Sequence, residues 1–157
     1  MIKRIENLYT LYNNVFEHIP IIYAFYNEYN GIDNDILLSY LILPLVLNEA
    51  SRKKLLHSNS RSSIFTFCKD SGTFSGLSDM VKLYESITND CIQYGIDNLV
   101  FSITEEMKVI INKETDTESF GLLNNQNDKI RAAEKFAALI KCYDIPTIYR
   151  NLGVVEL

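Results

Sequence analysis

The residues of this chain best suited to hold a catalytic metal ion are Asp97 and the run Glu106-Met107-Lys108. They loosely match the D…E-x-K pattern, which binds a metal ion and activates water. Glu106, however, is expected at the tip of a turn, where no shaped, dry site would surround it. The competing interpretation is an ordinary Glu-Lys pair on the surface of a hairpin. We favour it, because such short patterns often arise by chance.

Other motifs for catalysis or cofactor binding are not found. The sequence has no phosphate-binding G-x-x-x-x-G-K-[ST] loop, no G-x-G-x-x-G, no H-E-x-x-H and no G-x-S-x-G. His18 and His57 are the only histidines, and neither is near a candidate nucleophile in the sequence. Cys68, Cys91 and Cys142 form no C-x-x-C pair, and their apolar neighbours predict small buried side chains. We therefore expect no enzyme activity, no metal ion and no cofactor.

Positive charge gathers in one part of the chain, at Arg52, Lys53, Lys54 and Arg61. The whole chain has a net charge of −5, whereas proteins that hold nucleic acid usually carry the opposite balance. These four cations are therefore the candidates for contact with DNA phosphates. The alternative is that they complement a helix C-terminus or the acidic surface of a partner.

The elements that would position these residues are mostly helices, because apolar residues recur at helical spacing along the chain. Asn13 or Asn14 is a candidate cap within the first helix, which Pro20 should kink or divide. Asp33 is the expected N-cap of the second helix, and Gly95 is the expected C-cap of the fourth. We predict helices over residues 8–29, 34–47, 62–69, 75–94 and 128–143, and a short one from Pro146 to Gly153.

The segments between these helices are expected to be loops, except for one pair of strands. The polar stretch that carries the basic residues, 51–57, and the Asn-rich segment 114–127 are the predicted loops. Two short β-rich runs, 99–103 and 108–111, predict a hairpin that turns at Thr104 to Met107.

The order of short helix, turn, longer helix and hairpin is typical of a winged helix-turn-helix. We predict a single domain over 1–157 that is mostly α with a small β-hairpin. Its winged-helix-like core would span about 61–112, with extra N-terminal helices in 5–56 and C-terminal helices in 128–152.

The charge of the predicted winged helix argues against DNA in a groove. Between Asp70 and Glu106 the only basic residue is Lys82. Such a surface would repel phosphate, so we expect this core to bind protein, with a winged-helix DNA-binding regulator as the alternative. The acidic residues of the segment are Asp70, Asp79, Glu85, Asp90, Asp97, Glu105 and Glu106.

The first predicted helix has apolar residues on more than one face. Tyr9, Ile21 and Phe25 lie off its main apolar face and are candidates for a surface that meets a partner. Ordinary core packing in a two-layer helical domain is the alternative for each of them. The most apolar run, 36–47, is far shorter than the ~20 residues that span a bilayer. The amino terminus also has no apolar core of a signal peptide, so we expect a cytoplasmic protein without membrane contact.

Three stretches, by their order and spacing, resemble the middle component of bacterial three-component ABC-ATPase conflict systems, of which the Lamassu anti-phage and anti-plasmid systems are one kind. They are Tyr12–Glu17, Leu43–Leu47 with the following Ser51-Arg52, and Tyr143–Val154. The segment Asn59–Ser63 is similar to the polar stretch that opens a short helix in that family. Val15 stands where family members often have proline, which leaves open where the first helix starts.

The resemblance implies a function that the residues alone do not specify. Members of the family are encoded between, or beside, a long coiled-coil ATPase of the SMC/Rad50 type and an effector, often a nuclease. The resemblance implies a winged-helix accessory subunit that bridges the ATPase heads and holds the effector until foreign DNA is sensed. Contact with DNA would then occur mainly through the complex. The family has no catalytic residues to transfer to this chain.

Overall fold

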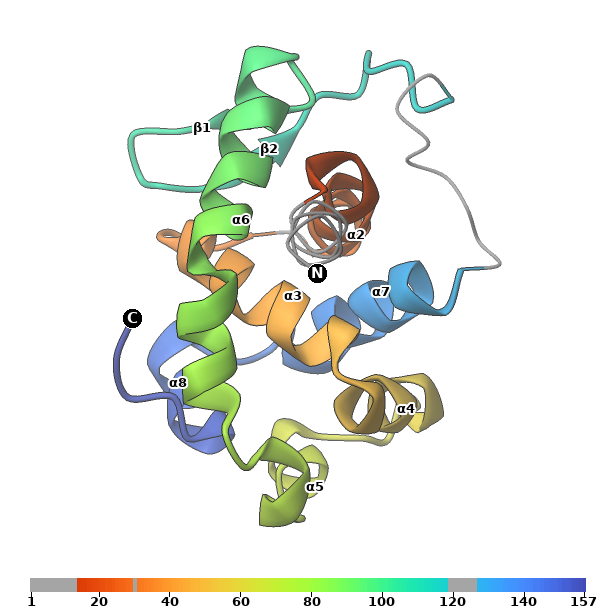
Figure 1. Cartoon of the computed structure of the whole chain (residues 1–157), viewed down its shortest axis with the longest axis vertical. Coiled ribbons are helices and arrows are strands. Elements are labelled where there is room, and N and C mark those ends of the chain that lie inside the picture. Colours follow the sequence, from red (N-terminus) through yellow and green to blue (C-terminus); the bar gives the residue numbers. More distant parts are fainter. Residues whose placement is uncertain (1–13, 30, 119–126) are drawn as a thin grey trace, which may run out of the picture.

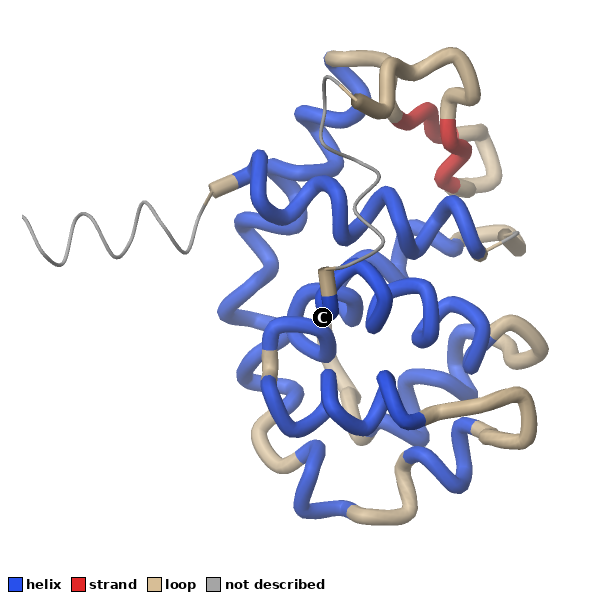
Figure 2. Tube along the Cα trace, turned by 90° about the vertical axis from the view of Figure 1, so that its right-hand side faces the viewer, coloured by secondary structure: helices blue, strands red, loops and turns tan. Residues whose placement is uncertain are grey.

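The structure is a computed structural model that describes residues 14–29, 31–118 and 127–157. Its described part is mostly helical, with one small antiparallel sheet at one end of the helical body (Figures 1 and 2). The helices are α2 (Val15–Glu28), α3 (Ser39–Leu47), α4 (Glu49–His57), α5 (Ile64–Phe67), α6 (Leu77–Asp97), α7 (Asp128–Ile140) and α8 (Ile145–Leu152). The two short 3-10 helices are η1 (Asp35–Leu38) and η2 (Ser71–Phe74), and the strands are β1 (Phe101–Ile103) and β2 (Val109–Ile111).

The core lies where α2 and α3 pass between the outer helices. α2 packs on α7 and α6, α3 packs on α6, and α4 packs on α7 (Figure 1). The fully buried side chains of this core come from elements far apart in the sequence and include Phe25, Leu41 and Phe136. None of the described helices is both long and apolar enough to cross a membrane.

Two of the predicted helix ends are confirmed. The Asn14 side chain caps α2, since its Oδ1 accepts the Phe16 N–H at 3.1 Å. Gly153 ends α8 with φ 72°, the left-handed conformation that favours glycine. Pro20 lies inside α2.

The start of the second predicted helix differs from the expectation. Residues 35–38 form the 3-10 helix η1, and the α-helical part begins only at Ser39. Asn34 precedes η1 in the left-handed conformation, with φ 63°, which Asn tolerates better than most residues. Asp33 is not the cap, and its carboxylate instead lies 3.4 Å from Lys108 Nζ.

The basic stretch predicted as a loop is the helix α4. Asn48 supplies the cap that makes this possible, because its Oδ1 accepts the Ser51 N–H at 3.1 Å. An i,i+4 pair of Glu49 and Lys53, with a 2.5 Å contact, adds support along the exposed face.

Gly95 does not end the fourth predicted helix, since α6 continues to Asp97. Its lack of a side chain serves packing instead: a Cβ at this position would overlap the Phe101 ring. The hairpin therefore lies directly against the last turns of α6.

The predicted hairpin is confirmed, although its strands are shorter than the β-rich runs. Phe101 faces Ile111 and Ile103 faces Val109 in an antiparallel register. Side chains alternate, so that Phe101 and Val109 are buried while Ile110 is exposed.

The winged helix-turn-helix over about 61–112 stays a prediction. The elements occur in the expected order, but α5 packs on α8, and α6 packs on α3 and α2. α2 and α7, which belong to the N-terminal helices predicted in 5–56 and the C-terminal helices predicted in 128–152, pack on each other.

Candidate functional site

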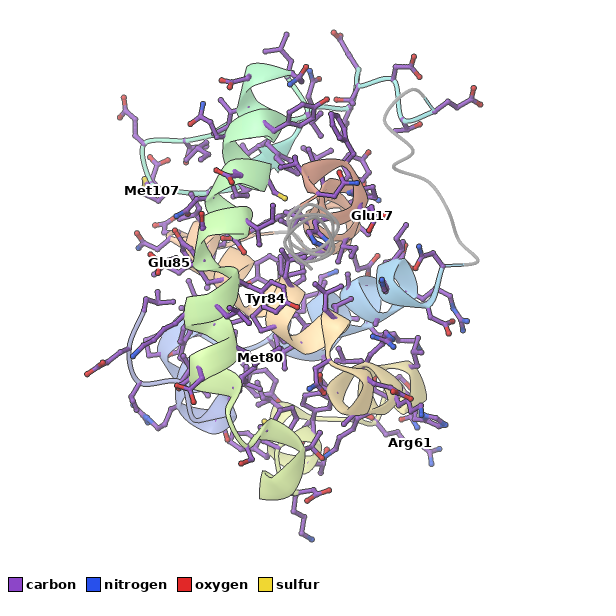
Figure 3. All side chains as sticks on the ribbon, viewed as in Figure 1. Glu17, Arg61, Met80, Tyr84, Glu85 and Met107 are labelled. Atoms are coloured by element: carbon purple, nitrogen blue, oxygen red, sulfur yellow. The ribbon has the colours of Figure 1, made fainter. Side chains whose placement is uncertain are left out.

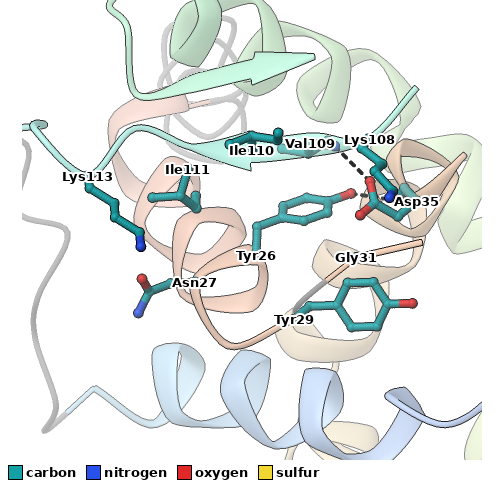
Figure 4. Close-up of a pocket in the computed structure, with 10 residues that line it drawn as sticks. All are labelled: Tyr26, Asn27, Tyr29, Gly31, Asp35, Lys108, Val109, Ile110, Ile111 and Lys113. Carbon is teal, nitrogen blue, oxygen red and sulfur yellow. Dashed lines mark hydrogen bonds between the residues drawn. The ribbon is translucent and has the colours of Figure 1, made fainter. Parts of the chain in front are cut away.

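A pocket of about 500 Å³ lies between the end of α2 and strand β2 (Figure 4). Helix α2 and the turn after it supply one wall, and the hairpin supplies the other. Both walls mix aromatic or aliphatic groups with polar ones, as ligand and peptide sites do. The lining residues are Tyr26, Asn27, Tyr29 and Gly31 on the first side, Lys108–Ile111 and Lys113 on the second, and Asp35 between them.

Asp35 joins the two walls, and its side chain is fully buried. Its Oδ1 accepts the backbone N–H of Val109 at 2.7 Å, and its carbonyl accepts the Tyr26 hydroxyl at 2.9 Å. Its Oδ2 has no hydrogen-bond partner among the described residues. Gly31 is adjacent, and any side chain there would overlap Oδ2. The carboxyl group thus fastens the hairpin to η1 through one oxygen and packs tightly with the other.

Burial is the main cause of the shifted pKa values of the acidic and tyrosine side chains in this pocket. It raises the pKa of Asp35 to about 6, against the lowering effects of the Val109 amide and of Lys108. It also raises the pKa of Tyr29 to about 12 and that of Tyr26 well above its ordinary value, with Asp35 adding to both shifts. The tyrosines therefore stay neutral, and Asp35 is the group of this pocket that titrates near physiological pH.

Sequence reasoning did not identify Asp35. It lies among three polar residues, Asp33, Asn34 and Asp35, any of which could cap a helix. Asp35 differs from the other two because its side chain accepts the N–H of Val109, which lies 74 residues later in the sequence.

The predicted phosphate-binding cations lie on and after α4, but they differ in what they contact. Arg52 Nη1 donates to the carbonyls of Val46 and Leu47, at 2.9 and 3.0 Å, at the end of α3. This is the alternative role, in which a cation complements a helix C-terminus. Lys53 pairs with Glu49 on the exposed face.

The other two cations of the set are separated by their surroundings. Lys54 Nζ lies over two aromatic rings, 5.5 Å from the centroid of Phe67 and 5.3 Å from that of Phe74. Arg61 is exposed at the rim of the molecule beside α4 (Figure 3), and its side chain pairs with no other residue in the described ranges. Contact of these cations with phosphate stays a prediction.

The residues proposed to meet a partner are not on the surface where the structure describes them. Ile21 and Phe25 are 2% and 0% exposed, which supports core packing and corrects the interface prediction for both. The Phe25 ring packs against those of Tyr29 and Phe136, with centroids 5.3 and 5.4 Å apart. Tyr9 lies outside the described residues.

The residues of the D…E-x-K pattern take part in other contacts. Asp97 accepts from Gln93 Nε2 at 2.8 Å, Lys108 contacts Asp33, and Glu106 is exposed in the hairpin turn. A hydrogen bond from Thr104 lowers the pKa of Glu106. Within the described residues, no group of three or more His, Cys, Asp and Glu side chains could hold a metal ion.

The cysteines differ from the prediction at one position. Cys91 is buried and Cys68 is half-buried, as expected for small apolar side chains. Cys142 is exposed, because it follows the end of α7 in the short connection to α8.

Comparison with known proteins gives one match. The model of a family described as ABC-three component (ABC-3C) system Middle Component 3 matches residues 2–156. Searches of curated proteins and of solved structures gave no match.

Proposed function

The chain belongs to the family of Middle Component 3 of ABC-three component systems, and we propose that it acts there as a non-catalytic adaptor subunit. The observation that carries the proposal is the extent of the match, which includes residues 2–156 of 157. The match therefore includes nearly the whole of the chain and is not confined to one segment of it.

Our proposal is more specific than the family description. The partners would be a coiled-coil ATPase of the SMC/Rad50 type and a nuclease-type effector of a Lamassu-like anti-phage or anti-plasmid defence complex in the cytoplasm. The adaptor would bridge the ATPase heads and restrain the effector until foreign DNA is sensed. The predicted winged helix over about 61–112 would serve protein contacts in this assembly.

Exposed apolar side chains on the described surface support a role in assembly. Phe16 is 67% exposed at the start of α2, although its ring meets Tyr94 edge to face at 5.3 Å. Leu83 on α6 and Leu99 before β1 are 71% and 70% exposed. Aromatic side chains are enriched, and charged ones depleted, at the cores of protein interfaces.

Co-expression with the ATPase and the effector encoded beside this gene tests the proposal. We expect all subunits to elute as one complex from a sizing column, with and without ATP, whereas the chain alone elutes later. Elution of the chain by itself under all these conditions contradicts an adaptor role. Cleavage of DNA by the chain alone, with Mg²⁺ or Mn²⁺, contradicts its non-catalytic character.

A DNA contact within the complex is tested separately at Lys53 and Arg61, which are the two exposed cations of the four. The variant Lys53→Glu with Arg61→Glu leaves the Arg52 contacts to α3 in place. If α4 meets phosphate, this variant weakens retention of duplex DNA and reduces its dependence on salt. Equal retention of the variant and the native complex excludes that contact.

A further inference from the structure

The pairing of the hairpin determines which backbone groups of β2 point away from β1. Thr104 N–H donates to Lys108 O, and Asn112 N–H donates to Val100 O, each at 3.0 Å. Hydrogen-bonded and non-hydrogen-bonded pairs alternate along an antiparallel ladder. Ile110 is therefore hydrogen-bonded to its partner in β1, whereas Val109 and Ile111 belong to the non-hydrogen-bonded pairs. The N–H and C=O groups of Val109 and Ile111 therefore point outward, along the free edge of β2.

One end of this edge is closed by the η1 segment. Asp35 Oδ1 accepts the Val109 N–H at 2.7 Å, and Ile36 N–H donates to Met107 O at 3.2 Å. Beyond this point, the Val109 C=O and both backbone groups of Ile111 form no hydrogen bond to another residue that the structure describes. Asp35 thus marks where the pairing of the edge ends and its open part begins.

The open part of the edge faces the pocket of about 500 Å³ (Figure 4). Tyr26 and Asn27 of α2 form the opposite wall, so the edge is not flush with the surface but lies along a recess. Exposed strand edges are usually blocked, because unpaired N–H and C=O groups invite another strand. Here the blocking stops halfway, beside a space that another chain can enter.

The charged residues that line the recess indicate which charge an entering segment should carry. Lys108 and Lys113 lie on the β2 side, and Lys113 is exposed with no ion pair among the described residues. The carboxyl group of Asp35 is turned into the protein, toward Val109 and Gly31. Lys108 lies at the closed end and already contacts Asp33, 3.4 Å away. An entering segment therefore meets the ammonium group of Lys113 at the open end of the edge.

We propose that an extended, acidic segment of a partner subunit adds as a strand to the edge of β2 at Ile111. Its backbone pairs with the Ile111 N–H and C=O, and an acidic side chain of the segment lies beside Lys113. Strand addition of this kind takes its affinity from main-chain hydrogen bonds and its selectivity from the side chains that flank them. The inference rests on the proposed adaptor function, which supplies the partner subunits.

Amide hydrogen exchange of the full chain, free and in the co-expressed complex, tests this directly. In the complex we expect exchange at Ile111 to slow by about tenfold or more, because its N–H gains a partner. The Ile110 amide, already paired with β1, is the internal reference. Separate complexes with the ATPase alone and the effector alone identify which subunit supplies the segment.

Two pairs of variants test the contacts themselves. Ile111→Pro removes the outward N–H, whereas Ile111→Val keeps it, and we expect only the first to weaken binding by about tenfold. Lys113→Glu should weaken binding severalfold at low salt, whereas Lys141→Glu, an exposed lysine beyond α7, should not. Thermal unfolding shows whether the proline variant folds. If it does not, the exchange data and the lysine pair decide.

The outcomes separate the inference from the function on which it rests. Failure to form any complex contradicts the adaptor role. A stable complex in which Ile111 exchanges as fast as in the free chain contradicts strand addition alone. Slow exchange at Ile111 that appears in the free chain as its concentration rises means that β2 pairs with a second copy, and this also overturns the inference.

Discussion

Asp35 accepts the backbone N–H of Val109 across 74 residues of sequence, and this 2.7 Å bond joins the 3-10 helix η1 to the edge of the hairpin. The pairing uses a side chain where a sheet would use a third strand. It also brings a carboxyl group to a fully buried position, so the connection depends on pH.

The first prediction concerns that dependence. The folded pKa of Asp35, about 6, lies above its ordinary value of 3.8, so folding favours the protonated form. Its contribution to stability is complete below about pH 4 and is lost as the pH rises through about 6. Relative to Asp35→Asn, the native chain should lose up to about 3 kcal/mol of unfolding free energy over this window.

Urea unfolding of both proteins at a series of pH values from about 4 to about 7.5 measures this difference. The comparison with Asp35→Asn cancels the titration of the other carboxylates, which both proteins share. A difference that does not change with pH contradicts a raised pKa at Asp35.

The second prediction concerns the close approach of α6 to the hairpin. Gly95→Ala places a methyl group into the Phe101 ring and should lower the unfolding free energy by about 1 to 3 kcal/mol. The added loss should shrink when Phe101→Leu is present, because the two positions share one contact. Gly72→Ala is the control, since a Cβ there meets only Asp70 Oδ1 at 3.5 Å. Equal effects of the two alanine variants contradict the packing role.

The third prediction separates structure from DNA binding at the basic helix. Arg52→Lys keeps the charge but not the fork that donates to Val46 and Leu47, so it should lower the unfolding free energy by about 1 to 2 kcal/mol. Lys53→Met, which removes an exposed ion pair, should leave stability nearly unchanged. Thermal or urea unfolding compares them. An unchanged stability of Arg52→Lys means that the guanidinium is free for another partner.

The fourth prediction tests the corrected assignment of the α2 residues. Phe25→Ala removes a fully buried ring and should cost about 3 to 5 kcal/mol of unfolding free energy. Leu83→Ala, at a side chain that is 71% exposed, should leave stability nearly unchanged. Denaturant unfolding of the isolated chain measures both. A small loss of unfolding free energy in Phe25→Ala would contradict the burial of this side chain in the core.

Local signals predicted much of the fold. Helical spacing of apolar residues located most of the helices, and the Asn14 cap, the Gly153 end and the hairpin follow from short-range chemistry. What failed depends on tertiary packing, which the spacing of apolar residues and the capping rules do not contain. Gly95 reads as a helix end until Phe101 is seen to lie against it.

The candidate site was less accessible to such reasoning. The basic stretch read as a loop because its composition is polar, whereas Asn48 and the contacts of Arg52 make it a helix. The role of Asp35 could not be predicted, because it depends on where β2 lies in the fold and no local sequence pattern gives that position. The family resemblance supplied what the residues could not, and the match over 2–156 confirms a middle component of ABC-three component systems.

The packing of α2 on α7 has a consequence for how the chain is made. The ribosome releases α2 long before it releases α7, because more than half of the sequence separates them. Phe25 therefore cannot contact Phe136 until most of the chain has been synthesised. The core can therefore close, and the subunit can become ready for its partners, only after the last helices have been synthesised.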